Sequence, residues 1–64
     1  MKLENLLNRI DMFMDVEVYD CFGTLLTNYD GRNSINLEYN DWHVYDFFIK
    51  EHEVRIWIEE PEEV

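Results

Sequence analysis

The sequence predicts an α+β domain in which an N-terminal amphipathic helix packs on a four-stranded, mainly antiparallel sheet made of two hairpins. Two observations carry this prediction: the spacing of apolar residues changes from helical to alternating along the chain, and turn-forming residues divide the alternating part into strands. Hydrophobic residues make up 47% of the 64 residues and aromatic residues 16%. A disordered acidic segment would contain few aromatic residues, so this composition predicts a folded domain. We expect residues 1–60 to form one domain and residues 61–64 an acidic flexible tail.

The helix is predicted from apolar residues that recur every three or four positions near the N-terminus. They are Leu3, Leu6, Leu7, Ile10 and Phe13. Polar residues fill the other side, so the pattern predicts an amphipathic helix over residues 2–13. A helix of this length is marginal in water on its own, and its apolar stripe therefore has to be covered by the sheet.

The first hairpin is predicted from alternation and turn chemistry. Residues 15–20 alternate between apolar and polar side chains and contain β-branched residues, as strands do. Asp20 and Gly23 take the preferred first and fourth positions of a type I turn, and residues 24–29 can return as an antiparallel strand. In the first strand, Val16 and Val18 lie on one face, and Glu17 and Tyr19 lie on the other.

The second hairpin follows a longer connection. Residues 32–42 mix polar turn formers with apolar residues, which predicts an ordered crossover loop with a short helical turn after Ser34 that closes one end of the core. Residues 43–49 are expected to form a strand, residues 54–59 alternate almost perfectly, and the polar residues 50–53 between them form a turn. Tyr45, Phe47 and Ile49 are expected on one face. The strands are expected to bury Val16, Val18, Leu25 or Leu26, Phe47, Ile49, Val54, Ile56 and Ile58.

One helix covers only one face of such a sheet. The opposite face would combine charged side chains with exposed aromatic rings: Glu17, Tyr19, Asp46, Phe48, Arg55, Trp57 and Glu59. Aromatic residues anchor protein interfaces, so this face is a candidate docking surface for a target or a second copy. A simpler interpretation is that Phe48 and Trp57 pair across strands and only stiffen the hairpin.

Charge limits the possible partners. The chain has 15 acidic and 5 basic residues, which gives a formal net charge of −10. Such a surface repels nucleic acid and anionic membranes and attracts basic protein surfaces. We therefore expect no direct binding to nucleic acid, whose phosphates need Lys and Arg, and no membrane binding. Carboxylates at this density can imitate nucleic-acid phosphates, although the same acidity also serves solubility.

No catalytic or metal-binding pattern stands out, so we expect neither an enzyme nor a cofactor. With this many carboxylates, chance pairs carry little information about acid–base chemistry, and a small domain has little room for a pocket. His43 and His52 have a separation that matches no zinc pattern, and Cys21, the only cysteine, cannot form an intramolecular disulfide. With no signal peptide or apolar span, the expected location is the cytoplasm of the host cell.

Three runs outline the chain: Leu3-x2-Leu6-Leu7-x2-Ile10, Val16-Glu17-Val18-Tyr19-Asp20 and Val54-Arg55-Ile56-Trp57-Ile58. In this outline the whole chain resembles small acidic proteins of phages and other mobile elements, a group that includes anti-CRISPR proteins and other inhibitors of host defence. The resemblance implies a non-enzymatic inhibitor, and it carries over no individual functional residue.

The expected partner is a basic nucleic-acid-binding protein. Carboxylates would meet its Arg and Lys residues, and aromatic side chains would anchor the contact. The residues expected to bind are Asp15, Glu17, Tyr19, Asp20, Asp46, Phe48, Trp57, Glu59, Glu60, Glu62 and Glu63. Two alternatives remain open at this point: a small self-associating accessory protein that forms a homodimer, and an acidic antitoxin that neutralises a basic toxin.

Overall fold

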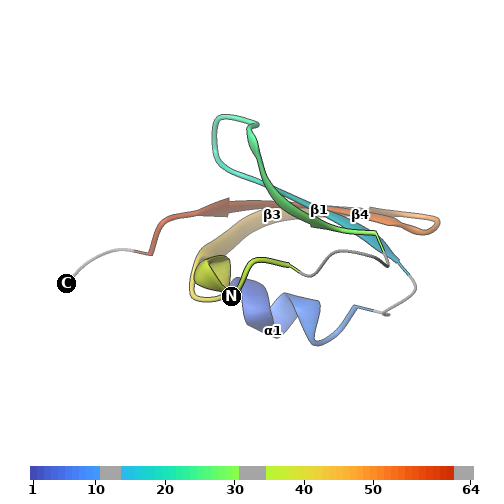
Figure 1. The fold of residues 1–64 in the computed structure, drawn as a ribbon, viewed down its shortest axis with the longest axis horizontal. Helices are drawn as coiled ribbons and strands as arrows, with labels where there is room; N and C mark the ends of the chain where they lie inside the picture. The colour runs from blue at the N-terminus through green and yellow to red at the C-terminus, as the bar shows by residue number, and fades with distance from the viewer. Residues whose placement is uncertain (11–13, 31–34, 62–64) are drawn as a thin grey trace.

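Four strands form one mixed sheet in the order β2-β1-β4-β3, with a short helix and a crossover segment on one side of it (Figure 1). This computed structural model describes residues 1–10, 14–30 and 35–61. The elements are α1 (Leu3–Leu7), β1 (Asp15–Tyr19), β2 (Leu25–Tyr29), the 3₁₀ helix η1 (Leu37–Tyr39), β3 (His43–Lys50) and β4 (Glu53–Glu59). The α+β class and the two hairpins are confirmed.

The expectation of a mainly antiparallel sheet is wrong, because the two hairpins meet through a parallel pair, β1 and β4. Each hairpin contributes its more buried strand to the centre. Val16 lies opposite Val54 and Val18 opposite Ile56, and all four side chains are buried. A central position lets these strands bury β-branched side chains under the helix while the more exposed strands β2 and β3 take the edges.

The connection between β2 and β3 supports this topology, since strands at opposite edges require a crossover. Its described part lies on the same side of the sheet as α1 (Figure 1). Ile35, Tyr39 and Trp42 pack against the core, and the rings of Tyr39 and Trp42 meet edge to face at 4.9 Å. The predicted helical turn is confirmed as η1, where the Asn36 side chain accepts a hydrogen bond from the Glu38 amide at 3.1 Å. Leu37 is exposed.

The helix is shorter than the predicted span 2–13. Beyond α1, the amides of Arg9 and Ile10 donate to carbonyls three residues earlier, at 3.0 and 3.2 Å. Such bonds belong to the tighter 3₁₀ geometry that commonly ends an α-helix. Asn8, at the C-cap, has a side chain that competes for backbone hydrogen bonds and weakens a helix at this point. The predicted position Phe13 lies outside the described residues.

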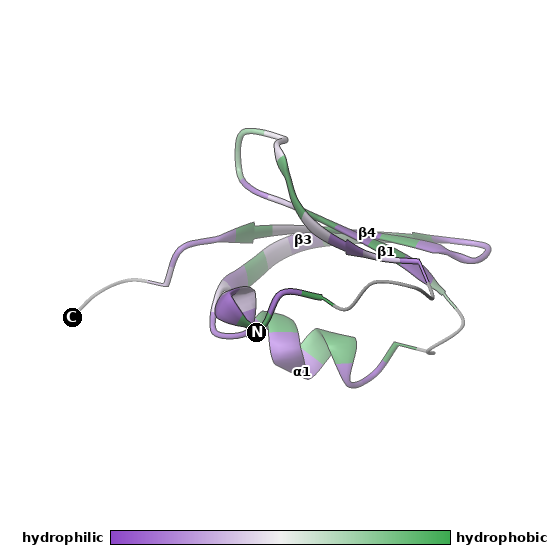
Figure 2. Cartoon of the chain, in the orientation of Figure 1, coloured by the Kyte–Doolittle hydropathy of each residue, from purple (hydrophilic) through white to green (hydrophobic). Residues whose placement is uncertain are grey.

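The core lies between the sheet and α1. Figure 2 shows hydrophobic segments on α1 and on the central strands. The buried hydrophobic residues are Leu3, Leu6, Val16, Val18, Val44, Val54, Ile56 and Ile58. Leu26 packs partly against this core, whereas Leu25 is exposed. The two core predictions for β3 fail in part: Phe47 and Ile49 remain 47% and 53% exposed.

A β-bulge explains a second error in β3, at Val44 and Tyr45. The pairing of β3 with β4 shifts between Val44 and Asp46, which leaves Tyr45 as the extra residue. A bulge reverses the alternation of side chains along its strand. Val44 therefore takes the buried position, and Tyr45 does not share the face of Phe47 and Ile49 as the sequence predicts.

The turn between β3 and β4 contains two residues rather than four, because Lys50 and Glu53 already pair. Its first residue, Glu51, has a φ of 52°, a conformation that favours glycine. We expect Glu51→Gly to stabilise the fold by about 0.5–1 kcal/mol because it relieves this strain. Urea unfolding followed by tryptophan fluorescence checks this. Glu51→Gln, which removes the charge and keeps the side chain, should leave the unfolding midpoint nearly unchanged. Equal gains from both variants would show that charge, not backbone strain, is responsible.

Candidate protein-binding face

The sheet face opposite α1, here called the outer face, bears no described helix (Figure 1). Strand pairing defines its rows, in which Tyr19 lies beside Trp57, Glu17 beside Arg55 and Asp15 beside Glu53. The outer face consists of Asp15, Glu17, Tyr19, Leu25, Asn28, His43, Asp46, Phe48, Lys50, Glu53, Arg55, Trp57 and Glu59. Seven of the residues predicted from the sequence to bind a partner are therefore brought onto one surface.

A stacked aromatic pair forms the centre of the outer face. The rings of Tyr19 and Trp57 are 5.8 Å apart with an interplanar angle of 22°. The Tyr19 hydroxyl donates a hydrogen bond to Oε2 of Glu17 at 2.7 Å, and the other oxygen of Glu17 lies 3.8 Å from Nε of Arg55. These contacts hold the pair in a fixed orientation, as a preformed anchor for a partner requires. Phe48 lies opposite Arg55, so the suggested pairing of Phe48 with Trp57 is wrong.

The hydrogen bond to Glu17 raises the pKa of Tyr19, with smaller contributions from burial and from the Glu17 charge. We expect Glu17→Gln to lower the pKa of Tyr19 because the amide binds the neutral phenol less strongly. An NMR titration of the Tyr19 ring at alkaline pH measures this, with Glu53→Gln as control. A folded-state pKa above that of the unfolded chain stabilises the fold below about pH 10, and this stability is lost as the pH rises through the folded pKa. An unchanged Tyr19 titration in Glu17→Gln would contradict the assigned cause.

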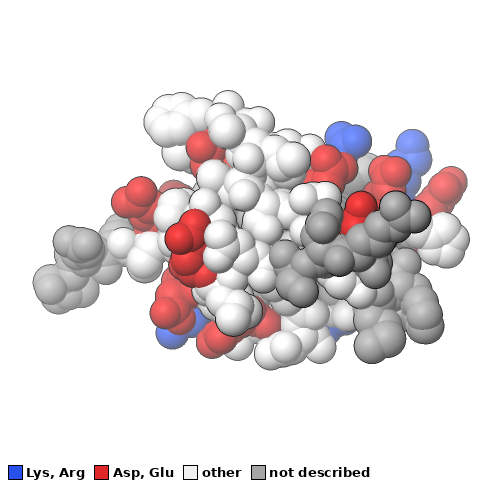
Figure 3. Space-filling model, viewed as in Figure 1, with Lys and Arg blue, Asp and Glu red and all other residues white. Residues whose placement is uncertain are grey.

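Carboxylates border the aromatic centre together with the guanidinium of Arg55, whose charge Glu17 partly balances. Asp46 lies opposite Trp57 in the β3–β4 ladder, and Glu59 follows on the same face of β4. Figure 3 views the sheet edge-on, as Figure 1 does, and shows that acidic side chains are spread widely over this side of the molecule whereas Lys and Arg are few. Among the described residues, no charged side chain is buried. The acidity therefore acts on the surroundings of the protein, where it attracts basic surfaces over a Debye length of about 8 Å at physiological salt.

The structure gives a different role to Asp20, which the sequence analysis placed among the binding residues. Its Oδ1 accepts hydrogen bonds from the amides of Phe22 and Thr24, both at 2.9 Å, and its carbonyl accepts one from Gly23 at 3.1 Å. The carboxylate therefore closes the β1–β2 turn, and Gly23 completes that turn with a φ of 83°. The predicted type I signature at Asp20 and Gly23 is confirmed in its residues and its hydrogen bond.

Tyr45 is a member of this region that sequence reasoning missed. Its pKa is raised first by burial and then by the charges of Cys21, Asp20, Asp46 and Glu59. The phenol thus lies within the electrostatic field of carboxylates from the β1–β2 turn, β3 and β4. Only the bulge places it there, and no local feature of the sequence around Tyr45 marks a bulge.

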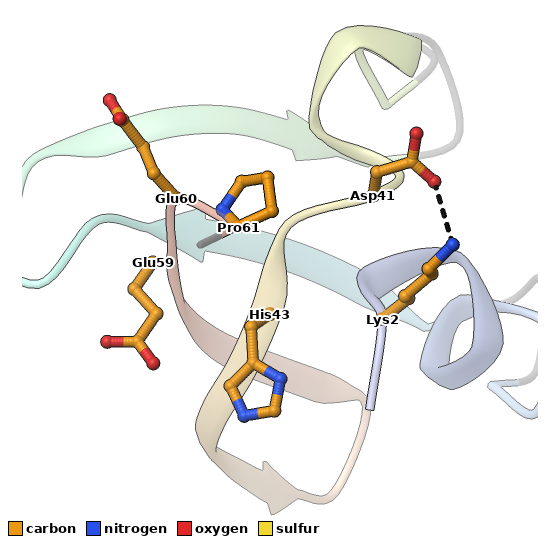
Figure 4. A pocket seen from close by; sticks show the side chains of 6 residues that line it. All are labelled: Lys2, Asp41, His43, Glu59, Glu60 and Pro61. Atoms are coloured by element: carbon orange, nitrogen blue, oxygen red, sulfur yellow. Dashed lines mark ion pairs between the residues drawn. The ribbon is translucent and has the colours of Figure 1, made fainter. Parts of the chain in front are cut away.

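A shallow pocket of about 390 Å³ adjoins the end of the outer face (Figure 4). It is lined by Lys2, Asp41, His43, Glu59, Glu60 and Pro61. Lys2 Nζ lies 3.4 Å from Oδ1 of Asp41, so these two charges satisfy each other. Glu59 and Glu60 are exposed and make no ion pair among the described residues, and their side chains point in different directions, so each carboxylate is open to a separate cationic side chain. The sequence could not reveal this site, because it joins three distant segments.

Three further properties follow from the described part of the chain. Its residues include no group of three or more His, Cys, Asp or Glu side chains that could hold a metal ion. None of its helices has the length and apolar character needed to cross a membrane. Cys21 is an exposed free thiol. The predicted binding residues Glu62 and Glu63 lie outside the described residues.

Comparison with known proteins adds no relative: no protein-family model matches the chain, and neither curated proteins nor solved structures give a match.

Proposed function

We propose that this protein is a non-enzymatic inhibitor that binds a basic nucleic-acid-handling protein, a class of target that includes CRISPR effectors. One observation carries the proposal. The outer face presents a stacked, oriented Tyr19–Trp57 pair bordered by carboxylates, and no described helix covers it.

The chemistry of this face suits a groove that normally holds phosphates. Carboxylates form charge-assisted hydrogen bonds with the same Arg and Lys side chains that bind nucleic acid. Interfaces gain most of their affinity from a few aromatic anchors surrounded by polar groups, and the outer face has this arrangement around Trp57. The net charge of −10 speeds the encounter with a positive surface and repels the nucleic acid that competes for it.

The experiment that tests this proposal is capture from nuclease-treated host lysate with the tagged protein, eluted by a salt gradient and identified by mass spectrometry. We expect one basic nucleic-acid-binding protein that is released at moderate salt, because contacts between opposite charges are screened. Nuclease treatment excludes capture through bound DNA or RNA. Recovery of a basic toxin would instead indicate the antitoxin role. Recovery of the bait alone would contradict the proposal.

A further inference from the structure

The edge strand β3 exposes an unusual amount of apolar surface. Tyr45, Phe47, Phe48 and Ile49 follow each other closely along it, and their exposed fractions lie between 46% and 53%. Natural proteins protect such edges with charges, proline, bulges or covering segments, because a free apolar edge pairs with other strands. The exposed apolar edge of β3 is therefore a candidate site for pairing with another strand.

The N-terminus covers only the beginning of this edge. The Val44 amide donates to the Met1 carbonyl at 2.8 Å, and Lys2 pairs with His43 in an antiparallel bridge. Over residues 46–50, β4 is the only described strand that pairs with β3, so the outer edge is open there.

The direction of the free backbone groups follows from the register. Phe47 and Ile49 lie opposite Ile56 and Val54, and thus share the inner face with Val44. Residues on one face of an extended strand direct their N–H and C=O groups to the same edge, and Val44 directs its amide away from β4, toward Met1. Phe47 and Ile49 therefore direct their backbone groups to the free edge. The Phe47 amide donates there to Oδ1 of Asp46 at 2.9 Å, and no described strand pairs with the Phe47 carbonyl or with Ile49 on this edge.

The sequence of this open segment is complementary to itself when it runs antiparallel. Residues 46–50 read Asp-Phe-Phe-Ile-Lys. With a twofold axis at Phe48, Asp46 lies opposite the partner subunit's Lys50, and Phe47 lies opposite the partner subunit's Ile49. Phe47 and Ile49, whose backbone groups point to the free edge, then face each other as a hydrogen-bonded antiparallel pair, once the Asp46 carboxylate releases the Phe47 amide and turns to the partner subunit's Lys50. Opposite charges directly across strands are favourable, and aromatic and β-branched residues pair well.

Neighbouring registers lose this match. A twofold axis at Phe47 would place Asp46 opposite the partner subunit's Phe48. An axis at Ile49 would place Lys50 opposite the same residue. The paired segment is also limited in length. The β3–β4 turn begins directly after Lys50, and the edge that lies opposite this turn in the dimer is already covered by the partner subunit's Met1. The segment therefore specifies one register of five residues.

We propose that two copies of this chain pair antiparallel along residues 46–50 of β3, about a twofold axis at Phe48, to form one continuous eight-stranded sheet. The outer faces of the two copies would then lie side by side on the same surface. This inference does not rest on the proposed target, because it follows from the edge strand alone. It specifies by residue the homodimer that the sequence analysis left open.

Cysteine cross-linking tests the register. In the proposed dimer the two Phe48 residues face each other at a non-hydrogen-bonded position, where Cα atoms are about 4.5 Å apart. This separation falls within the range of about 4.4–6.8 Å that a disulfide requires. In a Cys21→Ser background, Phe48→Cys should therefore form a covalent dimer under mild oxidation, read by non-reducing electrophoresis and intact mass.

The same background supplies matched controls. Asp46→Cys alone and Lys50→Cys alone should stay monomeric, because each cysteine would lie about 13 Å from its counterpart, four residues along the strand. A mixture of the two should form the mixed dimer. Circular dichroism of the reduced variants confirms that each is folded. Equal cross-linking of all three single variants, or none by Phe48→Cys, would overturn the register.

Sedimentation velocity of the unaltered chain provides a readout that requires no mutant. We expect a monomer–dimer equilibrium that shifts toward dimer as salt rises, because salt screens the repulsion between two copies of charge −10. Asp46→Lys should weaken the dimer about 10-fold, and Asp46→Lys with Lys50→Asp should restore it. A monomer at all salt concentrations, or no recovery in the double variant, would overturn the proposal.

Discussion

Reversal of two charges at the end of the outer face, Glu59→Lys with Glu60→Lys, will weaken binding to the basic partner by at least about 100-fold. Both side chains are exposed, and neither has a hydrogen-bond or ion-pair partner among the described residues, so the fold does not depend on them. In the complex, each lysine would meet the cationic side chain that its glutamate had bound, and such like-charge contacts cost several kcal/mol. Isothermal titration calorimetry with the captured partner measures the change, since each factor of ten is about 1.4 kcal/mol.

A second double variant, Glu4→Lys with Glu51→Lys, is the matched control. It changes the net charge by the same amount but acts on α1 and on the β3–β4 turn, away from the pocket at Glu59 and Glu60. We expect it to weaken binding only a few-fold, through reduced long-range attraction. If both double variants lost affinity equally, the partner would be sensing total charge, and the assignment of the outer face as the binding surface would be wrong.

Replacement of Ile56 by alanine is expected to cost about 2–5 kcal/mol of folding free energy. Ile56 is fully buried on the central strand β4, opposite Val18 of β1 and Phe47 of β3. A protein of this size typically has about 3–10 kcal/mol of stability, so the cavity would remove a large share of it. Urea unfolding followed by tryptophan fluorescence gives the loss directly.

Ile49→Ala is the comparison for this core variant. It removes the same atoms from the same face of the neighbouring strand, but Ile49 is 53% exposed and loses less on truncation. We expect its cost to be less than half that of Ile56→Ala. Equal costs would mean that the free edge of β3 is already packed in solution, which sedimentation at the same concentration would resolve.

The sequence predicted local structure well where one period dominates. The alternation of Val54, Ile56 and Ile58 against Arg55 and Trp57 places β4 correctly, because a half-buried strand needs that period. The residues of the β1–β2 turn were also correct, since a positive φ at the end of the turn favours glycine. These features depend on neighbours within a few residues.

Features set by distant segments could not be read in this way. The parallel pairing of β1 with β4 depends on which two strands bury the most apolar surface under α1, and both hairpins fit either orientation locally. The bulge at Tyr45 likewise breaks the period of β3 and is not marked by its neighbours in the sequence. One irregular residue was enough to exchange Val44 and Tyr45 between the core and the surface.

The candidate site likewise has one part that local sequence predicts and another that depends on distant segments. The outer-face positions of Glu17, Tyr19 and Trp57 follow from strand alternation alone, so they were predictable. The stacking of Tyr19 on Trp57 was not, because it requires β1 and β4 to be neighbours. The pocket beside Glu59 was not predictable either, since it joins the N-terminus, the start of β3 and the end of β4.

The most direct test of the inhibitor role is a competition experiment with the partner identified by capture. A fluorescently labelled nucleic acid is bound to that partner, and this protein is titrated in while anisotropy is recorded. If the outer face occupies the nucleic-acid site, the anisotropy falls to that of free nucleic acid at one equivalent, and Glu59→Lys with Glu60→Lys does not lower it. An anisotropy that stays high while calorimetry shows binding would mean that both ligands bind at once, and would contradict the proposed inhibition.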